Sequence, residues 1–183
     1  SGLVYDGSEY ISAAAFPETR NNVVVIHSMS KNFAMTGWRV GMLFASEEII
    51  NRSKILQSQN TTCAAAVSQW ASVAALQSSN EITGEIREKM QARRDVLVEA
   101  IKEKFSTEIK KPSCALYCFG PLSAFGVASD ESSADFCMRV LEEAHIAMVP
   151  GSAFGVEGYV RISFGEQEGE LKEAIEKLSA YLQ

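Results

Sequence analysis

Two short apolar runs near the start of the chain have the pattern of β-strands. Residues 23–26 are all β-branched and lie between Asn22 and Ser28, a pattern typical of a strand buried on both faces of an α/β sheet. A second run, residues 40–45, follows after a polar connection that is too short for a crossover helix of usual length. The two strands are therefore predicted to be antiparallel neighbours or to lie apart in one sheet. Their connection lies at a sheet end, where α/β folds bind ligands.

The following segments have helical patterns. Ser46, followed by two acidic residues, predicts a capped helix that runs to about Gln59. Thr61 or Thr62 is predicted to cap the next helix, which is rich in alanine around Trp70. Its small residues suit close helix packing or a subunit interface.

A long third helix is predicted to begin with Asn80 as its N-cap. Its apolar residues recur at steps of three or four, which is the spacing of one buried helix face, while Glu, Lys and Arg occupy most other positions. The predicted buried face consists of Ile82, Ile86, Met90, Leu97, Ile101 and Phe105.

After residue 110 the pattern changes to short strands alternating with short helices. Strands are predicted at residues 115–119, 147–150 and 159–164, and helices at residues 132–145 and 166–182. This mixture is typical of an α+β unit. The chain is therefore predicted to contain two domains, residues 1–105 and residues 106–183, with the break inside or at the end of the long helix.

Composition and charge narrow the classes of partner. The chain has 183 residues, of which 46% are hydrophobic and 22% are charged, so a globular chain is expected and a disordered one is excluded. Lys and Arg number 17 against 23 acidic residues, and the net charge of −6 argues against a nucleic-acid partner. The longest uncharged stretch, residues 55–80, contains Gln, Ser, Thr and Asn residues that are costly in a membrane. Neither nucleic acid nor membrane is therefore an expected partner.

The cysteines and the start of the chain bear on its cellular setting. The four cysteines show no C-x-x-C spacing and no nearby His, so neither a zinc site nor a disulfide is predicted and no metal is expected. Nothing resembles a secretion signal, and reduced thiols in the cytoplasm are the expectation. Ser1-Gly2 resembles a protease-cleavage scar and the chain enters abruptly at Leu3, which predicts a fragment of a longer protein.

Side chains able to perform chemistry gather between residues 27 and 41. Lys31 lies just past the end of the first predicted strand, the hydroxyls of Ser28 and Ser30 precede it, and Arg39 follows eight residues later. Burial among apolar neighbours disfavours the ammonium form of a lysine and makes it an imine-forming nucleophile, while hydroxyls and a guanidinium together suit a phosphate. The combination points to pyridoxal 5′-phosphate, which carries both an aldehyde and a phosphate. From the spacing alone, a surface lysine beside a surface arginine is an equally good interpretation.

The run S-x-S-K-x-F-x-M-T-G-W-R-V-G resembles the cofactor-lysine signature of the class I and II aminotransferases of fold type I, especially the aspartate aminotransferase-like branch. The resemblance implies that Lys31 bonds to the cofactor aldehyde and that Ser28 and Arg39 bind its phosphate, with Ser30 beside them. Related aminocyclopropane-carboxylate synthases tend to carry Asp after the lysine and P-G-F-R in place of T-G-W-R. Asn32 and the T-G-W-R sequence therefore favour transamination over elimination.

A second match lies near the end of the chain. The sequence V-P-G-S-A-F-G, residues 149–155, and the sequence Y-V-R-I-S-F, residues 159–164, resemble the family segment whose arginine binds the substrate α-carboxylate. The resemblance gives this role to Arg161. Two parallel N–H···O bonds from a rigid guanidinium fix both the position and the orientation of a carboxylate, which a lysine cannot do. An outward-facing arginine on a strand is the alternative, and the joint match with the Lys31 region argues against it.

The resemblance also implies the architecture. It indicates an α/β fold in which residues 1–105 contribute part of the three-layer sheet of the cofactor-binding large domain, and residues 106–183 form the C-terminal α+β small domain. It implies a homodimer for the intact protein, since both subunits complete the active sites in this family. The family's acidic and tyrosine contacts to the cofactor ring precede the segment at Leu3 and are absent here, and Tyr5 and Asp6 are not assigned to those roles. We therefore expect the C-terminal part, a little under half, of such an enzyme.

The implied activity of the intact protein is pyridoxal phosphate-dependent transamination between an L-amino acid, with aspartate favoured, and 2-oxoglutarate. The isolated fragment is expected to be inactive. An alternative is the aminotransferase-like effector domain of a transcription regulator that senses the cofactor, which needs a basic DNA-binding segment upstream. A third interpretation is a truncated, inactive module that associates through the Ala-rich helix, and a reading frame beginning at Leu3 favours it.

Overall fold

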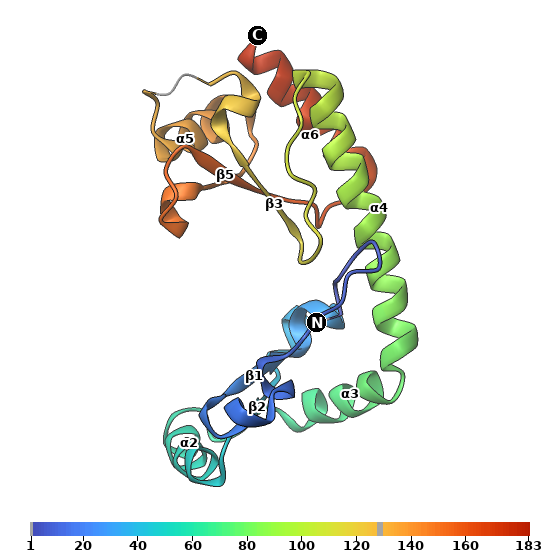
Figure 1. Cartoon of the computed structure of the whole chain (residues 1–183), viewed down its shortest axis with the longest axis vertical. Coiled ribbons are helices and arrows are strands. Elements are labelled where there is room, and N and C mark those ends of the chain that lie inside the picture. Colours follow the sequence, from blue (N-terminus) through green and yellow to red (C-terminus); the bar gives the residue numbers. More distant parts are fainter. Residues whose placement is uncertain (1, 128–129) are drawn as a thin grey trace. The chain divides into compact units, whose positions relative to one another are not determined.

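The computed structural model describes residues 2–127 and 130–183, without the side chains of residues 20 and 21 (Figure 1). Ser1 of the predicted cleavage scar lies outside this description. The chain divides into two compact units, Ser1–Arg87 and Glu88–Gln183. This division falls inside helix α4 (Ser79–Phe105). Because one continuous helix contributes to both units, the domain boundary after residue 105 stays a prediction.

The first unit contains a two-stranded antiparallel sheet. Strand β1 (Val25–Ser28) pairs with β2 (Gly41–Phe44), so that Ser28 lies opposite Gly41. Short helix α1 (Met29–Asn32) and the 3-10 turn η3 (Thr36–Trp38) form the connection, and two further turns, η1 (Ala13–Ala15) and η2 (Pro17–Asn22), precede β1. Of the two arrangements predicted for these strands, antiparallel neighbours or strands that lie apart in one sheet, the first is confirmed.

The prediction that the first strand is buried on both faces is wrong for this chain. Ile26 is 80% exposed, and inward and outward positions alternate along β1. Burial on both faces requires a layer of structure on each side of the sheet. Within the described residues, β1 and β2 form a sheet of two strands, so the apolar side chain of Ile26 has no covering layer.

Three helices follow the sheet: α2 (Glu47–Asn60), α3 (Ala66–Gln77) and α4. Ser46 is the N-cap residue of α2 as predicted, although its side chain makes no capping hydrogen bond. The capping prediction for Thr61 and Thr62 is wrong, because the amides of both residues bond back to the carbonyl of Gln57 and so end α2. Helix α4 begins at Ser79, so Asn80 lies in its first turn and is not its cap.

The core of the first unit fixes the β1–β2 connection. Met29 and Phe33 are buried with Met35 and with Ala75 of α3, and partly buried apolar residues pack around them. The small residues of α3 allow this approach, as the alanine-rich pattern predicted. The polypeptide between the two strands is therefore held by apolar packing on one side.

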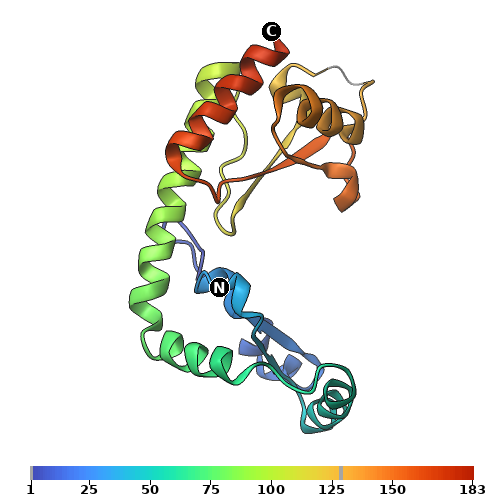
Figure 2. The same cartoon turned by 180° about the vertical axis from the view of Figure 1, so that it is seen from behind.

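The second unit is an α+β arrangement around a three-stranded antiparallel sheet. Strands β3 (Tyr117–Pro121), β5 (Tyr159–Ser163) and β4 (Val149–Pro150) lie in the order β3-β5-β4. Helix α5 (Ser133–Ala144) lies behind the strands in Figure 1 and in front of them in Figure 2, so it covers one face of the sheet. Helix α6 (Glu168–Leu182) contacts α5, and the 3-10 turns η4 (Leu122–Phe125) and η5 (Gly151–Phe154) complete the unit. All five elements predicted after residue 110 are present, with ends shifted by a few residues.

Strand alternation separates a buried face of this sheet from an open one. Cys118 and Val160 belong to the covered face and are fully buried, as is Phe136 of α5. Tyr117, Phe119 and Arg161 belong to the opposite face, where Phe119 lies directly across from Arg161. The open face is therefore aromatic and carries one central cation.

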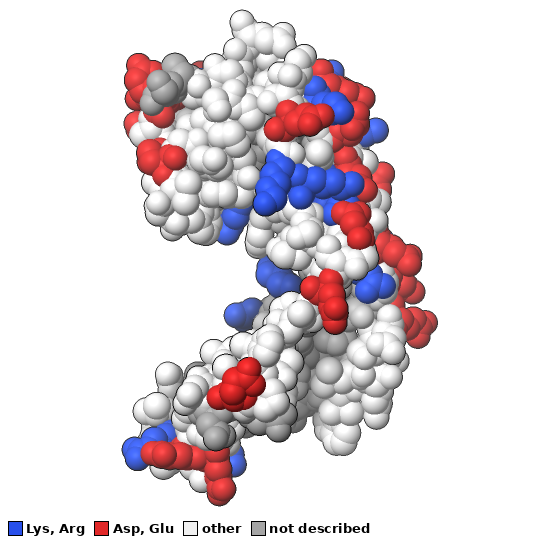
Figure 3. Space-filling model, in the orientation of Figure 1, with Lys and Arg blue, Asp and Glu red and all other residues white. Residues whose placement is uncertain are grey.

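Helix α4 follows the predicted pattern with one exception. Leu97 and Ile101 are buried, and the other four predicted face residues are partly buried. Arg94, which the apolar pattern skips, has an exposed fraction of 0%. Figure 3 shows both acidic and basic side chains on the surface along the edge that contains this helix. None of the described helices combines the length and the apolar character that crossing a bilayer requires.

Candidate cofactor and substrate site

Ser28 joins the end of β1 to the start of α1. It is the N-cap residue of α1, with extended backbone angles, and its Oγ accepts a hydrogen bond from the amide of Ser30 at 3.1 Å. Ser is favoured at this position because its side-chain oxygen satisfies an otherwise free amide of the first turn. The amide of Met29 also donates to the carbonyl of Val40 at 3.3 Å, which ties the connection to the neighbouring segment.

Lys31 lies in α1 with an exposed side chain. Among the described residues, its ammonium group has no hydrogen bond or ion pair. Met29 and Phe33, on either side of it in sequence, point into the core. The apolar environment that the sequence predicts around the Lys31 amine is therefore not formed by the described part of the chain, because these neighbours bury their own side chains instead.

Arg39 ends the η3 turn in the left-handed conformation, with φ of 51° and ψ of 48°. Its Nη1 donates to the carbonyl of Thr36 at 2.8 Å, which fixes the exposed guanidinium near the turn. A left-handed backbone is strained for a residue with a Cβ and persists where the surrounding structure compensates for it. The Thr36 contact and the start of β2 provide this support.

A cavity of about 440 Å³ lies beside the β1–β2 sheet. Ser28, Ser30 and Arg39 all line it, whereas Lys31 is not among its lining residues. Gly41 faces the same cavity, and a Cβ at this position would lie only 2.8 Å from the carbonyl oxygen of His27. The structure thus brings together three of the four predicted residues of this region.

The chemistry of these side chains fits a phosphate group. Two hydroxyls donate hydrogen bonds, and the guanidinium of Arg39 contributes a positive charge with N–H groups beyond the one used by Thr36. Lys31, one residue after Ser30 on the same short helix, carries a primary amine, although it does not line this cavity. The residues present can therefore hold a phosphate and offer an amine, which are the two attachments that pyridoxal 5′-phosphate uses.

Arg161 lies in the second unit, on the central strand of the three-stranded sheet. Its Cζ is 4.3 Å from the centroid of the Tyr117 ring and 4.8 Å from that of Phe154. The Phe119 ring contacts Phe154 edge to face at 6.0 Å and stacks on Tyr159 at 5.2 Å. Within residues 2–127 and 130–183, no acceptor is hydrogen-bonded to the guanidinium of Arg161, so its N–H groups remain available to a ligand.

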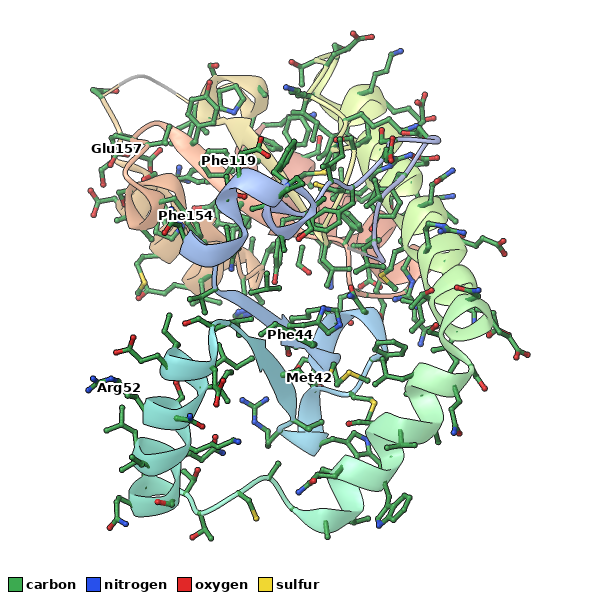
Figure 4. The ribbon with its side chains drawn as sticks, turned by 60° about the horizontal axis from the view of Figure 1, so that its bottom comes forward. Met42, Phe44, Arg52, Phe119, Phe154 and Glu157 are labelled. Atoms are coloured by element: carbon green, nitrogen blue, oxygen red, sulfur yellow. The ribbon has the colours of Figure 1, made fainter. Side chains whose placement is uncertain are left out.

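The loop that carries Phe154 also carries Glu157 (both labelled in Figure 4), whose carboxylate is the centre of a polar network. Oε1 of Glu157 accepts hydrogen bonds from the amides of Ser133, at 2.5 Å, and Gly158, at 2.9 Å. The hydroxyl oxygen of Ser133, a buried side chain, in turn accepts from the amide of Ser152 at 3.2 Å. These amides, that of Gly158 foremost, stabilise the carboxylate and lower the pKa of Glu157 below its usual value.

The four cysteines divide into two classes. Cys63 and Cys114 are exposed, while Cys118 and Cys137 are buried, and all four are free thiols. Burial raises the pKa of Cys118 to about 12 and that of Cys137 to about 11, because the thiolate loses its hydration. In the described ranges, no group of three His, Cys, Asp or Glu side chains is arranged to hold a metal ion.

Sequence reasoning missed two features of this molecule. Arg94 is buried, with Nε and Nη2 both 2.8 Å from Asp95 Oδ1 and Nη1 donating to the carbonyl of Pro112 at 2.9 Å. Its spacing of three from Leu97 places it on the apolar face, and this spacing was the available signal. The ring contacts of Arg161 were missed because Phe154 comes from a turn whose position only the folded loop determines.

Comparison with known proteins shows to which family the chain is similar. Residues 1–178 match the model of the family described as aminotransferase class I and II. The chain is 38% identical to an aspartate aminotransferase of Rhizobium meliloti strain 1021, over 97% of this chain and 45% of that protein. It is 34% identical to a probable N-acetyl-LL-diaminopimelate aminotransferase of Bacillus subtilis strain 168, over 100% of this chain and 45% of that protein.

Solved structures show the same likeness. An aromatic aminotransferase from Pyrococcus horikoshii OT3 superposes with a TM-score of 0.89 at 34% identity, over 99% of this chain and 48% of that one. The aspartate aminotransferase structure from Rhizobium meliloti also gives 0.89, at 36% identity and over 47% of its chain. The chain thus spans about half the length of the relatives it matches, and it aligns with their C-terminal part. On the family match, the relatives and the shared fold, the chain belongs to the class I and II aminotransferases.

Proposed function

We propose that this chain is the C-terminal portion of a pyridoxal phosphate-dependent aminotransferase that exchanges amino groups between an L-amino acid and 2-oxoglutarate. The observation that carries the proposal is the joint presence of an amine at Lys31, hydrogen-bond donors suited to a phosphate at Ser28 and Arg39, and a guanidinium at Arg161 that bonds to no acceptor among the described residues, in a chain of this family. Aspartate is the favoured donor, because relatives at 38% and 36% identity are aspartate aminotransferases.

Each residue has a separate task in this proposal. Ser28 and Arg39 hold the phosphate of the cofactor, with Ser30 beside them, and so fix its position relative to α1. Pyridoxal phosphate, when bound, supplies an electron sink that stabilises negative charge at the substrate Cα. Lys31 Nζ, as a free neutral amine, would take the proton from the substrate Cα and pass it to the cofactor carbon that carried the aldehyde, and the reverse transfer in the second half-reaction would place a proton on the Cα of the product amino acid. Arg161 binds the α-carboxylate that the amino acid and the oxo acid share, so one residue serves both half-reactions.

The proposal extends to the architecture of the intact protein. Residues 1–105 contribute to a larger, three-layer cofactor domain whose remaining layers come from the portion of the relatives that this chain does not span. Residues 106–183 form the small domain, and the intact enzyme is a homodimer. The exposed apolar side chains of the first unit, such as Ile26, support this view because a further layer of structure would remove them from water.

The test is made on the full-length protein that contains this chain. Addition of pyridoxal phosphate is expected to produce the absorption band of the covalently bound cofactor together with transaminase activity. Lys31→Ala is expected to abolish the band and to lower kcat by at least about a thousandfold, because both attachment and proton transfer are lost. Lys54→Ala, which removes another exposed lysine of the first unit, is the matched control and leaves the band unchanged.

Two results would contradict the proposal. A band unaffected by Lys31→Ala removes this residue from the mechanism. Turnover of aspartate and 2-oxoglutarate at enzyme-like rates by the 183-residue chain alone shows that the missing portion is dispensable for catalysis.

A further inference from the structure

Among the described residues, the guanidinium of Arg161 is flanked by two aromatic rings and is paired with no carboxylate. Its Cζ lies within 5 Å of two ring centroids, those of Tyr117 at 4.3 Å and Phe154 at 4.8 Å. A cation this close to an aromatic ring is attracted to its π-electrons. Arginine side chains are long and flexible, and fixing one in a single rotamer costs side-chain entropy. The two rings therefore reduce the number of conformations that Arg161 adopts without a ligand.

Aromatic partners of an arginine leave its N–H groups free to bind a ligand, whereas acidic partners do not. An aspartate or glutamate beside Arg161 would occupy the N–H groups that a substrate carboxylate needs. A ring attracts the delocalised charge while forming no conventional N–H···O bond, so the donors stay available for a bidentate contact. The arrangement holds the cation in place and preserves its capacity to bind an anion.

The fold brings both rings to Arg161 by independent routes. Tyr117 lies on β3, opposite Ser163 in the ladder, and therefore shares the open face of the sheet with Arg161. Phe154 is the last residue of η5, which is closed by Gly155 in the left-handed conformation. The Glu157 carboxylate and the Ser133 hydroxyl anchor the backbone on both sides of Phe154. A strand and an anchored turn thus hold the two rings, neither of which lies on a free loop end.

We propose that Tyr117 and Phe154 are positioning residues that orient the Arg161 guanidinium for the carboxylate of the substrate. The inference rests on the proposed function, in which Arg161 is the carboxylate-binding residue. It assigns to each ring a contribution to substrate affinity that acts through the arginine. Phe119, which lies across from Arg161 but contacts Phe154 and Tyr159, has no such role.

Affinity for a dicarboxylate tests the proposal directly. Maleate binding to the full-length protein loaded with pyridoxal phosphate is measured by titration calorimetry, alongside KM and kcat for the amino acid. Tyr117→Leu and Phe154→Leu are each expected to raise the maleate Kd and KM by about three- to tenfold, the range of one cation–π contact, with kcat changed less than twofold. Tyr117→Phe retains the ring and is expected to keep the original values, and Phe119→Leu is the control on the same face.

A fluorinated series separates electrostatics from packing, should the leucine variants unfold. Phe154 is replaced by phenylalanines with one, three and five ring fluorines, which nearly keep the ring's shape while weakening its attraction for cations. The maleate Kd is expected to rise with each step, and the same series at Phe119 is expected to be flat. A flat series at Phe154, or Tyr117→Phe weakening binding as much as Tyr117→Leu, overturns the inference.

Arg161→Lys distinguishes failure of this inference from failure of the proposed function. If Arg161→Lys leaves the maleate Kd unchanged, Arg161 does not bind the carboxylate, and both statements fail. If Arg161→Lys weakens binding while the ring variants do not, the carboxylate role stands and the positioning role alone is wrong.

Discussion

Gly151 shows how a single missing side chain allows the site loop to close. An added Cβ would overlap the carbonyl oxygen of Val156 and lie 2.6 Å from that of Tyr159. The loop folds back on itself so tightly at this point that only glycine fits. The position of Phe154, three residues later, depends on this closure.

Gly151→Ala is therefore expected to lower the free energy of unfolding by about 3 kcal/mol, because the backbone must move to relieve the overlap. Gly169→Ala is the control, since nothing lies within 4 Å of a Cβ there and the residue is exposed in α6. It is expected to increase stability by about 0.5 kcal/mol through helix propensity. Urea unfolding of both variants checks the opposite signs, and equal effects would contradict the close approach at Gly151.

Buried and exposed cysteines are expected to differ in reactivity. Cys63 and Cys114 react with a thiol reagent at pH 8, whereas Cys118 and Cys137 react only after unfolding. Because the folded pKa of Cys118, about 12, is raised above the ordinary value of 9.0, its stabilising contribution is present below pH 9 and is lost as the pH rises toward 12. Counting modified thiols by mass spectrometry checks the pattern, and four rapid modifications would contradict it.

Among the helices, α4 owes part of its packing to a buried charge. Arg94 is paired with Asp95 and bound to the carbonyl of Pro112, and Lys111 lies 2.9 Å from the same Asp95 oxygen. These contacts attach the segment after α4 to the helix itself. A buried cation with its partners in place is tolerated, while removal of Arg94 takes the charged donor away from the Pro112 carbonyl and leaves Asp95 with Lys111.

Arg94→Leu is expected to destabilise the chain by about 2 kcal/mol, since the Pro112 carbonyl loses a charged hydrogen bond and the leucine recovers only part of the packing. Arg87→Leu, an exposed arginine on the same helix, is the matched control and is expected to have little effect. Chemical denaturation followed by circular dichroism measures both. Equal stabilities for the two variants would show that the Arg94 contacts are energetically neutral.

The turn between β4 and β5 depends on the charge of Glu157. Its folded pKa is lowered, so its stabilising contribution is present above its unfolded pKa and is lost as the pH falls through its folded value. Glu157→Gln is expected to lower Tm at pH 7 and to approach the parent Tm as the pH falls toward the acid range. Glu166→Gln, which replaces another exposed glutamate, serves as the control. A Tm difference that is constant with pH would exclude the ionised carboxylate as the source of the effect.

At the scale of the whole molecule, the first unit exposes several large apolar side chains. Ile26 is 80% exposed, Trp70 74% and Leu56 73%, and they lie on a strand and two helices of that unit. Large exposed apolar patches mark surfaces that another protein segment covers. In the proposed enzyme, the part of the relatives that this chain does not span supplies such segments.

The chain by itself is therefore expected to self-associate at micromolar concentration. Trp70→Glu combined with Leu56→Glu is expected to reduce the association, because it removes apolar area and makes the net charge of −6 more negative. Sedimentation velocity of the parent chain and of the double variant checks this. Lys54→Ala, which changes an exposed polar residue of α2, is the control. A monomeric parent chain at these concentrations would contradict the expectation.

Much of the architecture followed from local patterns. The antiparallel β1–β2 pair, the Ser46 boundary of α2 and the five elements after residue 110 were predictable, because alternation, helical spacing and capping chemistry act within a few residues. The burial of β1 on both faces was not predictable, since it depends on the layers of structure that cover each face of the sheet, which the local pattern does not show. The predicted apolar environment of the Lys31 amine was also wrong, because the apolar residues next to Lys31 in sequence pack into the core, away from its amine.

Sequence patterns alone were sufficient for the candidate residues Ser28, Lys31, Arg39 and Arg161, because their chemistry and spacing are local and carry the family resemblance. Their roles stay predictions. The tertiary structure was needed to place Ser28, Ser30 and Arg39 around one cavity and to bring Phe154 to Arg161, since these contacts depend on how the intervening turns fold, which residue spacing does not specify. It also decided that Arg94 is buried, because burial depends on what packs against a helix and the helix sequence specifies only which residues share a face.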